Sequence, residues 1–76
     1  MDNIMVTFQV GKIINEDISV PAFVSIQELI GMLSEAFSFG IKPENRIQAE
    51  PLGRILNNNL TLEQEGVSHG ALLTLI

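Results

Sequence analysis

Apolar and polar residues alternate along the first stretch of the chain. In residues 4–10 (IMVTFQV), one face would carry Ile4, Val6, Phe8 and Val10, and the residues between them would lie on the other face. A period of two with β-branched and aromatic residues predicts a half-buried strand.

A second strand is predicted over about residues 13–20. Gly11-Lys12 is a turn signal that separates it from the first strand, and Ile18 and Val20 are in phase. Pro21 has no N–H to donate to a sheet, so we expect the strand to end there.

The period becomes helical at Ser25. Ser25 and Glu28 have the S-x-x-E spacing of a capping box, in which each side chain satisfies a backbone N–H. Gly40 is positioned to stop the helix in a left-handed conformation. Between them, apolar residues recur every three or four positions and predict a single stripe made of Ile26, Leu29, Ile30, Leu33, Ala36 and Phe37.

The remainder of the chain returns to strand patterns. Ile47 and Ala49 are expected to point inward from the first of these strands, and the polar loop 61–70 is expected to be anchored by Leu62 and Val67. The predicted strands cover residues 45–50, 54–56 and 71–76.

The order β-β-α-β-β-β predicts an α+β fold, a mixed sheet of four to five strands with one helix packed on one face. For the helix to cover both hairpins, the first and last strands should lie side by side and parallel, through a right-handed connection. That arrangement is the β-grasp. We expect residues 1–76 to form a single domain.

Three segments resemble ubiquitin: the Gly11-Lys12 turn, the helix exit at 40–46 (GIKPENR) and the closing segment 61–76 (TLEQEGVSHGALLTLI). Ubiquitin and the sulfur carriers of this fold act through a C-terminal Gly-Gly, whereas this sequence ends at Ile76. The resemblance therefore implies a ubiquitin-like domain that is not conjugated.

The chain is also similar to the YukD/EsaB-like proteins, which are bacterial ubiquitin-like domains of about this length that lack a Gly-Gly tail. The similar segments are 6–10 (VTFQV), 20–33 (VPAFVSIQELIGML) and 70–76 (GALLTLI). This resemblance implies a protein–protein interaction or accessory role, regulating or assisting a type VII (WXG-substrate) secretion system. Two alternatives stay open: a modifier or sulfur carrier whose Gly-Gly lies beyond Ile76, or the cytoplasmic ubiquitin-like domain of a membrane secretion component.

Charge and composition limit the classes of partner that we expect the protein to bind. The net charge of −5 opposes nucleic-acid binding, which requires Lys and Arg to neutralise phosphates. The start MDNIMVTF lacks a basic segment and a long apolar stretch, so we expect no signal peptide. No apolar run is long enough for membrane insertion, and we therefore expect a cytoplasmic protein. Its partners are expected to be proteins, with secretion-machinery components as candidates, and its oligomeric state is open.

Neither an enzymatic activity nor a cofactor or metal is expected. There is no cysteine, and His69 is the one histidine, expected to be exposed or bonded in a turn. The carboxylate pairs Glu16/Asp17 and Glu63/Glu65 are expected to be solvated loop charges.

The open face of the sheet is the candidate interaction site, because strand side chains alternate between two faces. With Ile4, Val6, Phe8, Ile47, Leu73 and Leu75 under the helix, the outward residues are Met5, Thr7, Gln9, Arg46, Gln48, Leu72, Thr74 and Ile76. Ubiquitin's main recognition patch is on the same face, but its central apolar position on the third strand would be Gln48 in this chain. The candidate interaction residues are Met5, Gln48, Leu72, Thr74 and Ile76.

Overall fold

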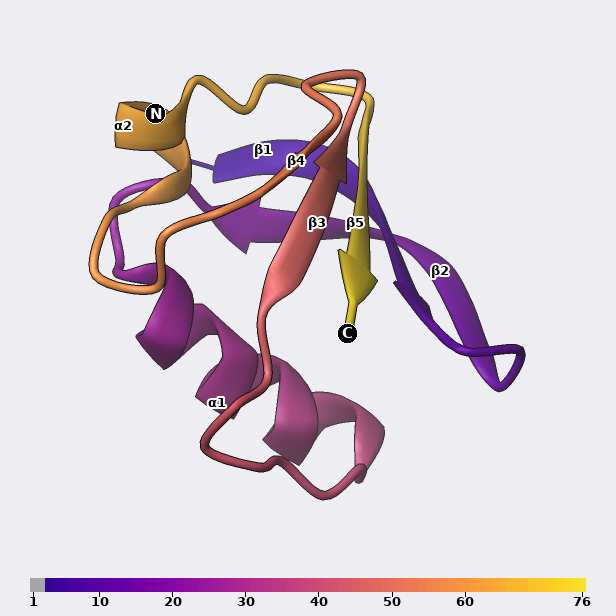
Figure 1. Cartoon of the computed structure of the whole chain (residues 1–76). Coiled ribbons are helices and arrows are strands. Elements are labelled where there is room, and N and C mark those ends of the chain that lie inside the picture. Colours follow the sequence, from indigo (N-terminus) through magenta and orange to yellow (C-terminus); the bar gives the residue numbers. More distant parts are fainter. Residues whose placement is uncertain (1–2) are drawn as a thin grey trace.

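The structure, a computed structural model of the chain, describes residues 3–76 (Figure 1). Strands and helices follow one another in the order β-β-α-β-β-α-β, with bounds β1 Asn3–Val10, β2 Ile14–Pro21, α1 Ile26–Phe37, β3 Ile47–Glu50, β4 Arg54–Ile55, α2 Leu62–Glu65 and β5 Ala71–Leu75. The predicted strands are all present, with ends that differ by one or two residues.

The strands form one mixed sheet in the order β2-β1-β5-β3-β4. The two central strands, β1 and β5, are parallel, with Val6 opposite Ala71 and Phe8 opposite Leu73. The other neighbouring pairs are antiparallel. The predicted β-grasp arrangement is therefore confirmed, with α1 packed across one face of the sheet (Figure 1).

Helix α1 begins after the predicted cap residue, Ser25, but only the Ser25 half of the predicted capping box is formed; the helix ends two residues earlier than expected. The Ser25 hydroxyl accepts a hydrogen bond from the Glu28 N–H at 3.1 Å, which satisfies one of the free donors at the helix start. At the other end, Ser38 adopts the left-handed conformation (φ 58°), so the prediction that Gly40 stops the helix was wrong. The early stop has a reason in the packing, because Phe39 must return to the core.

Phe8 is the centre of that packing. It is fully buried, and its ring lies 5.7 Å from the ring of Phe37 and 6.0 Å from that of Phe39, measured between centroids. A helix extended to Gly40 would carry Phe39 away from Phe8, since successive helical residues point about 100° apart. Ala36, predicted to be in the apolar stripe, is exposed instead, because Phe37 takes the inward position at the last turn.

The rest of the core follows the predicted alternation. Val6, Ile47 and Leu73 are buried beneath α1, and Ile4 and Leu75 pack partly buried against the same cluster. The inward phase of the sheet is therefore confirmed.

The segment 61–70 contains a short helix, α2, that was expected to be loop. Thr61 and Gln64 form a complete capping box: Thr61 Oγ1 accepts from the Gln64 N–H at 3.0 Å, and Gln64 Oε1 accepts from the Thr61 N–H at 2.9 Å. Leu62 and Val67 are buried at 0% and 7% exposure, which confirms them as the anchors of this segment. Within residues 3–76, no helix has the length and apolar character needed to cross a membrane.

Candidate protein-interaction face

The open face of the sheet carries the side chains that the strands turn away from α1. Pairing registers fix their neighbours: Leu72 lies opposite Thr7 on β1, and Thr74 lies opposite Gln48 on β3. Partners directly opposite in a sheet point to the same face and lie about 4.5–5.5 Å apart at Cβ. The outward phase of the candidate residues therefore agrees with the observed registers.

Two of the apolar candidates are well exposed. Met5 and Ile76 each have 48% of their surface accessible, whereas Leu72 is half-buried between its neighbours. Ile76 lies beyond the end of β5 but continues its pairing, because its N–H and carbonyl bond to Arg46 at 2.9 and 3.1 Å.

A polar row divides these apolar residues. Gln9, Thr74 and Gln48 are neighbours across β1, β5 and β3, and the Thr74 hydroxyl donates to Gln9 Oε1 at 3.3 Å. Thr74 stands between Leu72 and Ile76 on the same strand, and alternate strand residues are about 6–7 Å apart. The structure thus groups Met5 with Leu72 at one end of β5 and leaves Ile76 at the other end.

Ile55 is an exposed apolar residue on this face that the sequence reasoning missed. It pairs with Gln48 across β3 and β4 and is 49% exposed. Its neighbour Leu56 is fully buried and donates its N–H to Ile47, so alternation sends Ile55 outward. The alternation of residues 54–56 could therefore have identified Ile55 as an outward residue from the sequence alone.

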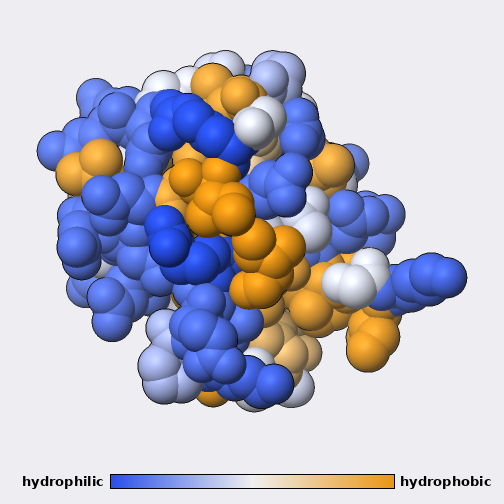
Figure 2. Space-filling model, viewed as in Figure 1, coloured by the Kyte–Doolittle hydropathy of each residue, from blue (hydrophilic) through white to orange (hydrophobic). Residues whose placement is uncertain are grey.

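Figure 2 shows a band of hydrophobic residues over β3 and the end of β5, with hydrophilic residues on both sides.

Polar and charged side chains on this face form hydrogen bonds with neighbouring residues. The Thr7 hydroxyl donates to Asp17 Oδ1 at 2.7 Å, and Gln48 Nε2 donates to Glu50 Oε2 at 3.2 Å. Arg46 turns its guanidinium to the carbonyl of Leu56 at 2.7 Å. A partner would therefore meet apolar groups and already satisfied polar groups, a combination typical of protein interfaces.

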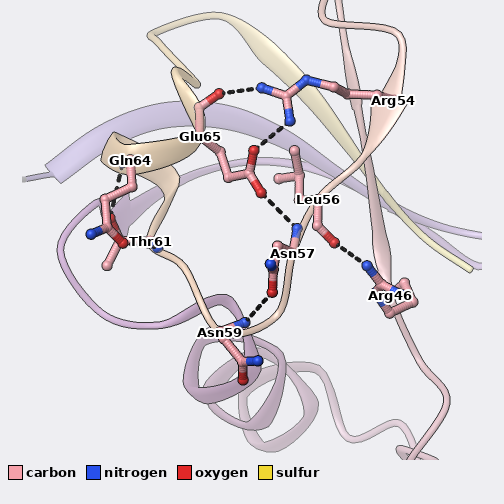
Figure 3. A network of polar contacts seen from close by, with 8 residues as sticks. All are labelled: Arg46, Arg54, Leu56, Asn57, Asn59, Thr61, Gln64 and Glu65. Carbon is pink, nitrogen blue, oxygen red and sulfur yellow. Dashed lines mark hydrogen bonds and ion pairs between the residues drawn. The ribbon is translucent and has the colours of Figure 1, made fainter.

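Glu65 is not a solvated loop charge, so that prediction was wrong. It is 7% exposed, and Figure 3 shows its carboxylate held between Arg54 and Asn57. One oxygen accepts from Arg54 Nη1, and the other accepts from the Asn57 N–H at 2.7 Å. Arg54 Nη2 also donates to the Glu65 carbonyl at 2.7 Å.

These contacts give Glu65 a structural role. The Asn57 N–H bond and the Arg54 guanidinium hold the pKa of the Glu65 carboxyl below its usual range, against the opposing effect of burial. A general acid at neutral pH needs the opposite shift. Glu65, Arg54 and Asn57 together form a clamp that ties β4 and the loop after it to α2. Glu63, by contrast, is exposed as predicted.

His69 is exposed and bonded in the turn before β5, as predicted. Its Nδ1 accepts the Met5 N–H at 3.1 Å, and the next residue, Gly70, donates its N–H to the Met5 carbonyl at 2.8 Å. The imidazole thus extends the β1–β5 ladder by one bond. Among residues 3–76, no cluster of three His, Cys, Asp or Glu side chains is arranged to hold a metal ion.

The comparisons with known proteins identify the fold. No family model matches the chain, and no curated protein matches it either. Among solved structures, the ubiquitin-like domain of the Mycobacterium tuberculosis type VII secretion system protein ECCD1 is 24% identical, with a TM-score of 0.69 over 100% of this chain and 99% of that one.

Two other solved structures show the same architecture at lower identity. A chain described as a molecular mimic of SUMO that promotes DNA repair is 14% identical, with a TM-score of 0.84 over 100% of this chain and 92% of that one. The ubiquitin of Caldiarchaeum subterraneum is 19% identical, with a TM-score of 0.74 over 97% and 91% of the two chains. At these identities the likeness establishes fold alone: this chain has the ubiquitin-like β-grasp fold.

Proposed function

We propose that this chain is a ubiquitin-like protein that acts by binding protein partners through its open sheet face. The observation that carries the proposal is the exposure of Met5, Ile55 and Ile76 on a face that α1 leaves uncovered. Exposed apolar side chains set among polar ones on one sheet face are a common feature of protein-binding surfaces. We place the interaction residues at Met5, Gln48, Leu72, Thr74 and Ile76, with Ile55 added from the register.

We further propose an accessory role in a type VII secretion system, carried out in the cytoplasm without conjugation or enzymatic activity. The support is the likeness to the ECCD1 domain over the full length of both chains, together with the sequence resemblance to YukD/EsaB-like proteins. Components of type VII secretion systems are the first partners to test. The two alternatives predict further coding sequence after Ile76, either a Gly-Gly tail or apolar membrane spans.

The test compares two substitutions to aspartate at matched exposure. Met5→Asp places a charge on the open face, and Met32→Asp places one on the exposed surface of α1; both methionines are 48% exposed. We expect Met5→Asp to weaken binding to the type VII secretion component that the protein recognises about tenfold, which corresponds to about 1.4 kcal/mol, and Met32→Asp to leave this affinity unchanged. Isothermal titration calorimetry measures the affinities.

Melting temperatures serve as the folding control, and both variants should stay close to the original protein because exposed substitutions usually cost less than about 0.5 kcal/mol. Leu72→Asp provides a second probe of the same face, although Leu72 is half-buried and its folding must be checked first. Equal affinity of the Met5→Asp variant and the original protein would show that the open face is not the binding surface.

A further inference from the structure

One row of side chains crosses the open face and has a carboxylate at each end. Asp17 on β2 lies opposite Thr7 on β1. Leu72 on β5 lies opposite Thr7 on one side and opposite Glu50 on the other. Residues directly opposite in a sheet point to the same face, so these four residues form a continuous row, the Leu72 row, with Met5 beside it on β1.

Both carboxylates of the Leu72 row are exposed and keep their negative charge. Asp17 Oδ1 accepts the Thr7 hydroxyl at 2.7 Å, and Glu50 Oε2 accepts a hydrogen bond from Gln48 Nε2 at 3.2 Å. A hydroxyl and an amide are neutral donors, so they satisfy an oxygen without cancelling its charge. Within residues 3–76, neither carboxylate forms an ion pair with a lysine or arginine.

The positive charges of the sheet are not available to this row. Strands β1, β2, β3 and β5 contain no lysine or arginine, and Arg54 on β4 is bound to Glu65. Arg46 bonds to Ile76, four residues beyond Leu72, which corresponds to about 13 Å along β5. The end of the open face that carries Met5 and Leu72 is therefore anionic, and an anionic surface favours a cationic partner in both encounter rate and specificity.

A hollow of about 180 Å³ adjoins the Asp17 end of the row. It is lined by Met5, Val6, Thr7, Asp17 and Gly70. Its walls combine an apolar side chain and a glycine with one carboxylate. This combination suits a lysine of a partner, whose aliphatic stem packs on apolar surface while its ammonium group reaches the carboxylate.

We propose that this end of the open face binds a partner segment in which one apolar residue lies between two basic residues. The inference rests on the proposed function and names the chemistry of the partner. Neighbouring strands are about 4.8 Å apart, so Asp17 and Glu50, separated by three strand spacings, lie about 14 Å apart.

The spacing of the two carboxylates matches an extended segment. In such a segment residues i, i+2 and i+4 point to one side, and the distance from i to i+4 is about 13 Å. The pattern basic–x–apolar–x–basic therefore places one cation over Asp17 and the other over Glu50. The apolar side chain between them lies over Leu72 and Met5.

The test uses a peptide of this pattern, lysine–serine–leucine–serine–lysine, blocked at both ends. A control peptide has glutamate in place of both lysines. In an NMR titration at about 50 mM salt, the lysine peptide should shift the amide resonances of Met5, Thr7 and Leu72 and bind about tenfold more tightly than the glutamate peptide. At about 500 mM salt the difference should nearly disappear, because salt screens exposed charges.

Four variants separate the charges of the row from the net charge of the protein. Asp17→Asn and Glu50→Gln should each weaken the lysine peptide about threefold. Glu16→Gln removes the same charge from β2 but should have no effect, because Glu16 pairs with the buried Phe8 and so points to the helix side. Met5→Ser, which removes the apolar contact without adding a carboxylate that would attract lysine, should weaken both peptides about fivefold.

The proposal is overturned if the two peptides bind equally, if the lysine peptide leaves the three amides unshifted, or if Glu16→Gln weakens it as much as Asp17→Asn does. The proposed function is judged separately, by the affinity of the Met5→Asp variant for a secretion component. An open face that binds this component but does not distinguish the two peptides would retain the proposed function and refute the basic pattern of the partner.

Discussion

The clamp around Glu65 makes a quantitative prediction for Glu65→Gln. This change keeps the size of the side chain and removes its charge. The glutamine retains one oxygen for the Asn57 N–H but turns an NH₂ group toward Arg54, so two donors face each other. The lost bond is charge-assisted, and bonds of this type contribute about 1.5–3 kcal/mol.

The exposure of Arg54 sets where in that range the loss should fall. The Glu65 side chain is 6% exposed, but that of Arg54 is 49% exposed, so solvent partly screens the pair. We therefore expect a loss of about 2 kcal/mol in the free energy of unfolding at pH 7, which lowers the melting temperature of a domain this size by roughly 8–16 °C. Circular dichroism in a urea and a thermal series measures both quantities.

The pH dependence of the stability tests the role of the Glu65 charge more directly. Because the folded-state pKa of Glu65 is lowered, the charged form stabilises the fold above the unfolded pKa of about 4.3, and this contribution disappears as pH falls through the folded value. The stability difference between the original protein and Glu65→Gln should be constant above about pH 6 and shrink below about pH 4. Glu63→Gln, on the exposed side of α2, is the control and should change stability by less than about 0.5 kcal/mol. A difference that is equally large at pH 3 and pH 7 would refute the assignment of the carboxylate charge to this clamp.

Three further substitutions test the local contacts, each by thermal or urea unfolding. Ser38→Gly should stabilise the domain by about 0.5–1 kcal/mol, because glycine adopts the left-handed conformation at φ 58° without the cost that serine bears; a loss of stability would contradict this. Thr61→Ala removes the hydroxyl acceptor of the α2 capping box and should cost about 1 kcal/mol, whereas an unchanged stability would mean that α2 does not depend on its cap. His69→Ala should cost about 0.5–1.5 kcal/mol and speed hydrogen exchange at the Met5 amide; unchanged exchange there would show that the Nδ1 bond is not formed in solution.

The strand alternation and the Ser25 cap could be read from the sequence because both depend on neighbours a few residues apart. Ser38 and Gly40 show where such reading fails. Glycine is the usual residue for a left-handed helix end, but Phe39 packs on Phe8, and this distant contact requires the chain to turn at Ser38 instead.

In the candidate interaction site, too, features that depend on residues distant in the sequence could not be predicted. The outward phase of Met5 and Ile76 followed from alternation alone, but the separation of Ile76 from Leu72 by a polar row depends on the register between strands. Glu65 was misjudged for a related reason: its partner Arg54 lies eleven residues earlier, and a buried ion pair leaves no local pattern in the sequence. The capping signal at Thr61 was visible, since a T-x-x-Q spacing marks a helix start.

The central position of β5 has a consequence for the order in which the protein folds during synthesis. β1 is made first, yet its parallel neighbour, Ala71–Leu75, is made more than sixty residues later. Ribosomes add about 5–20 residues per second, so β1 waits roughly 3–12 s and β3 roughly 1–4 s with an unpaired side. During that interval the β1–β2 hairpin and α1 can form from local contacts, but the sheet cannot close. We infer that folding is a late, nearly all-or-none event triggered by the arrival of β5, and that the nascent chain is most open to aggregation and chaperones just before it.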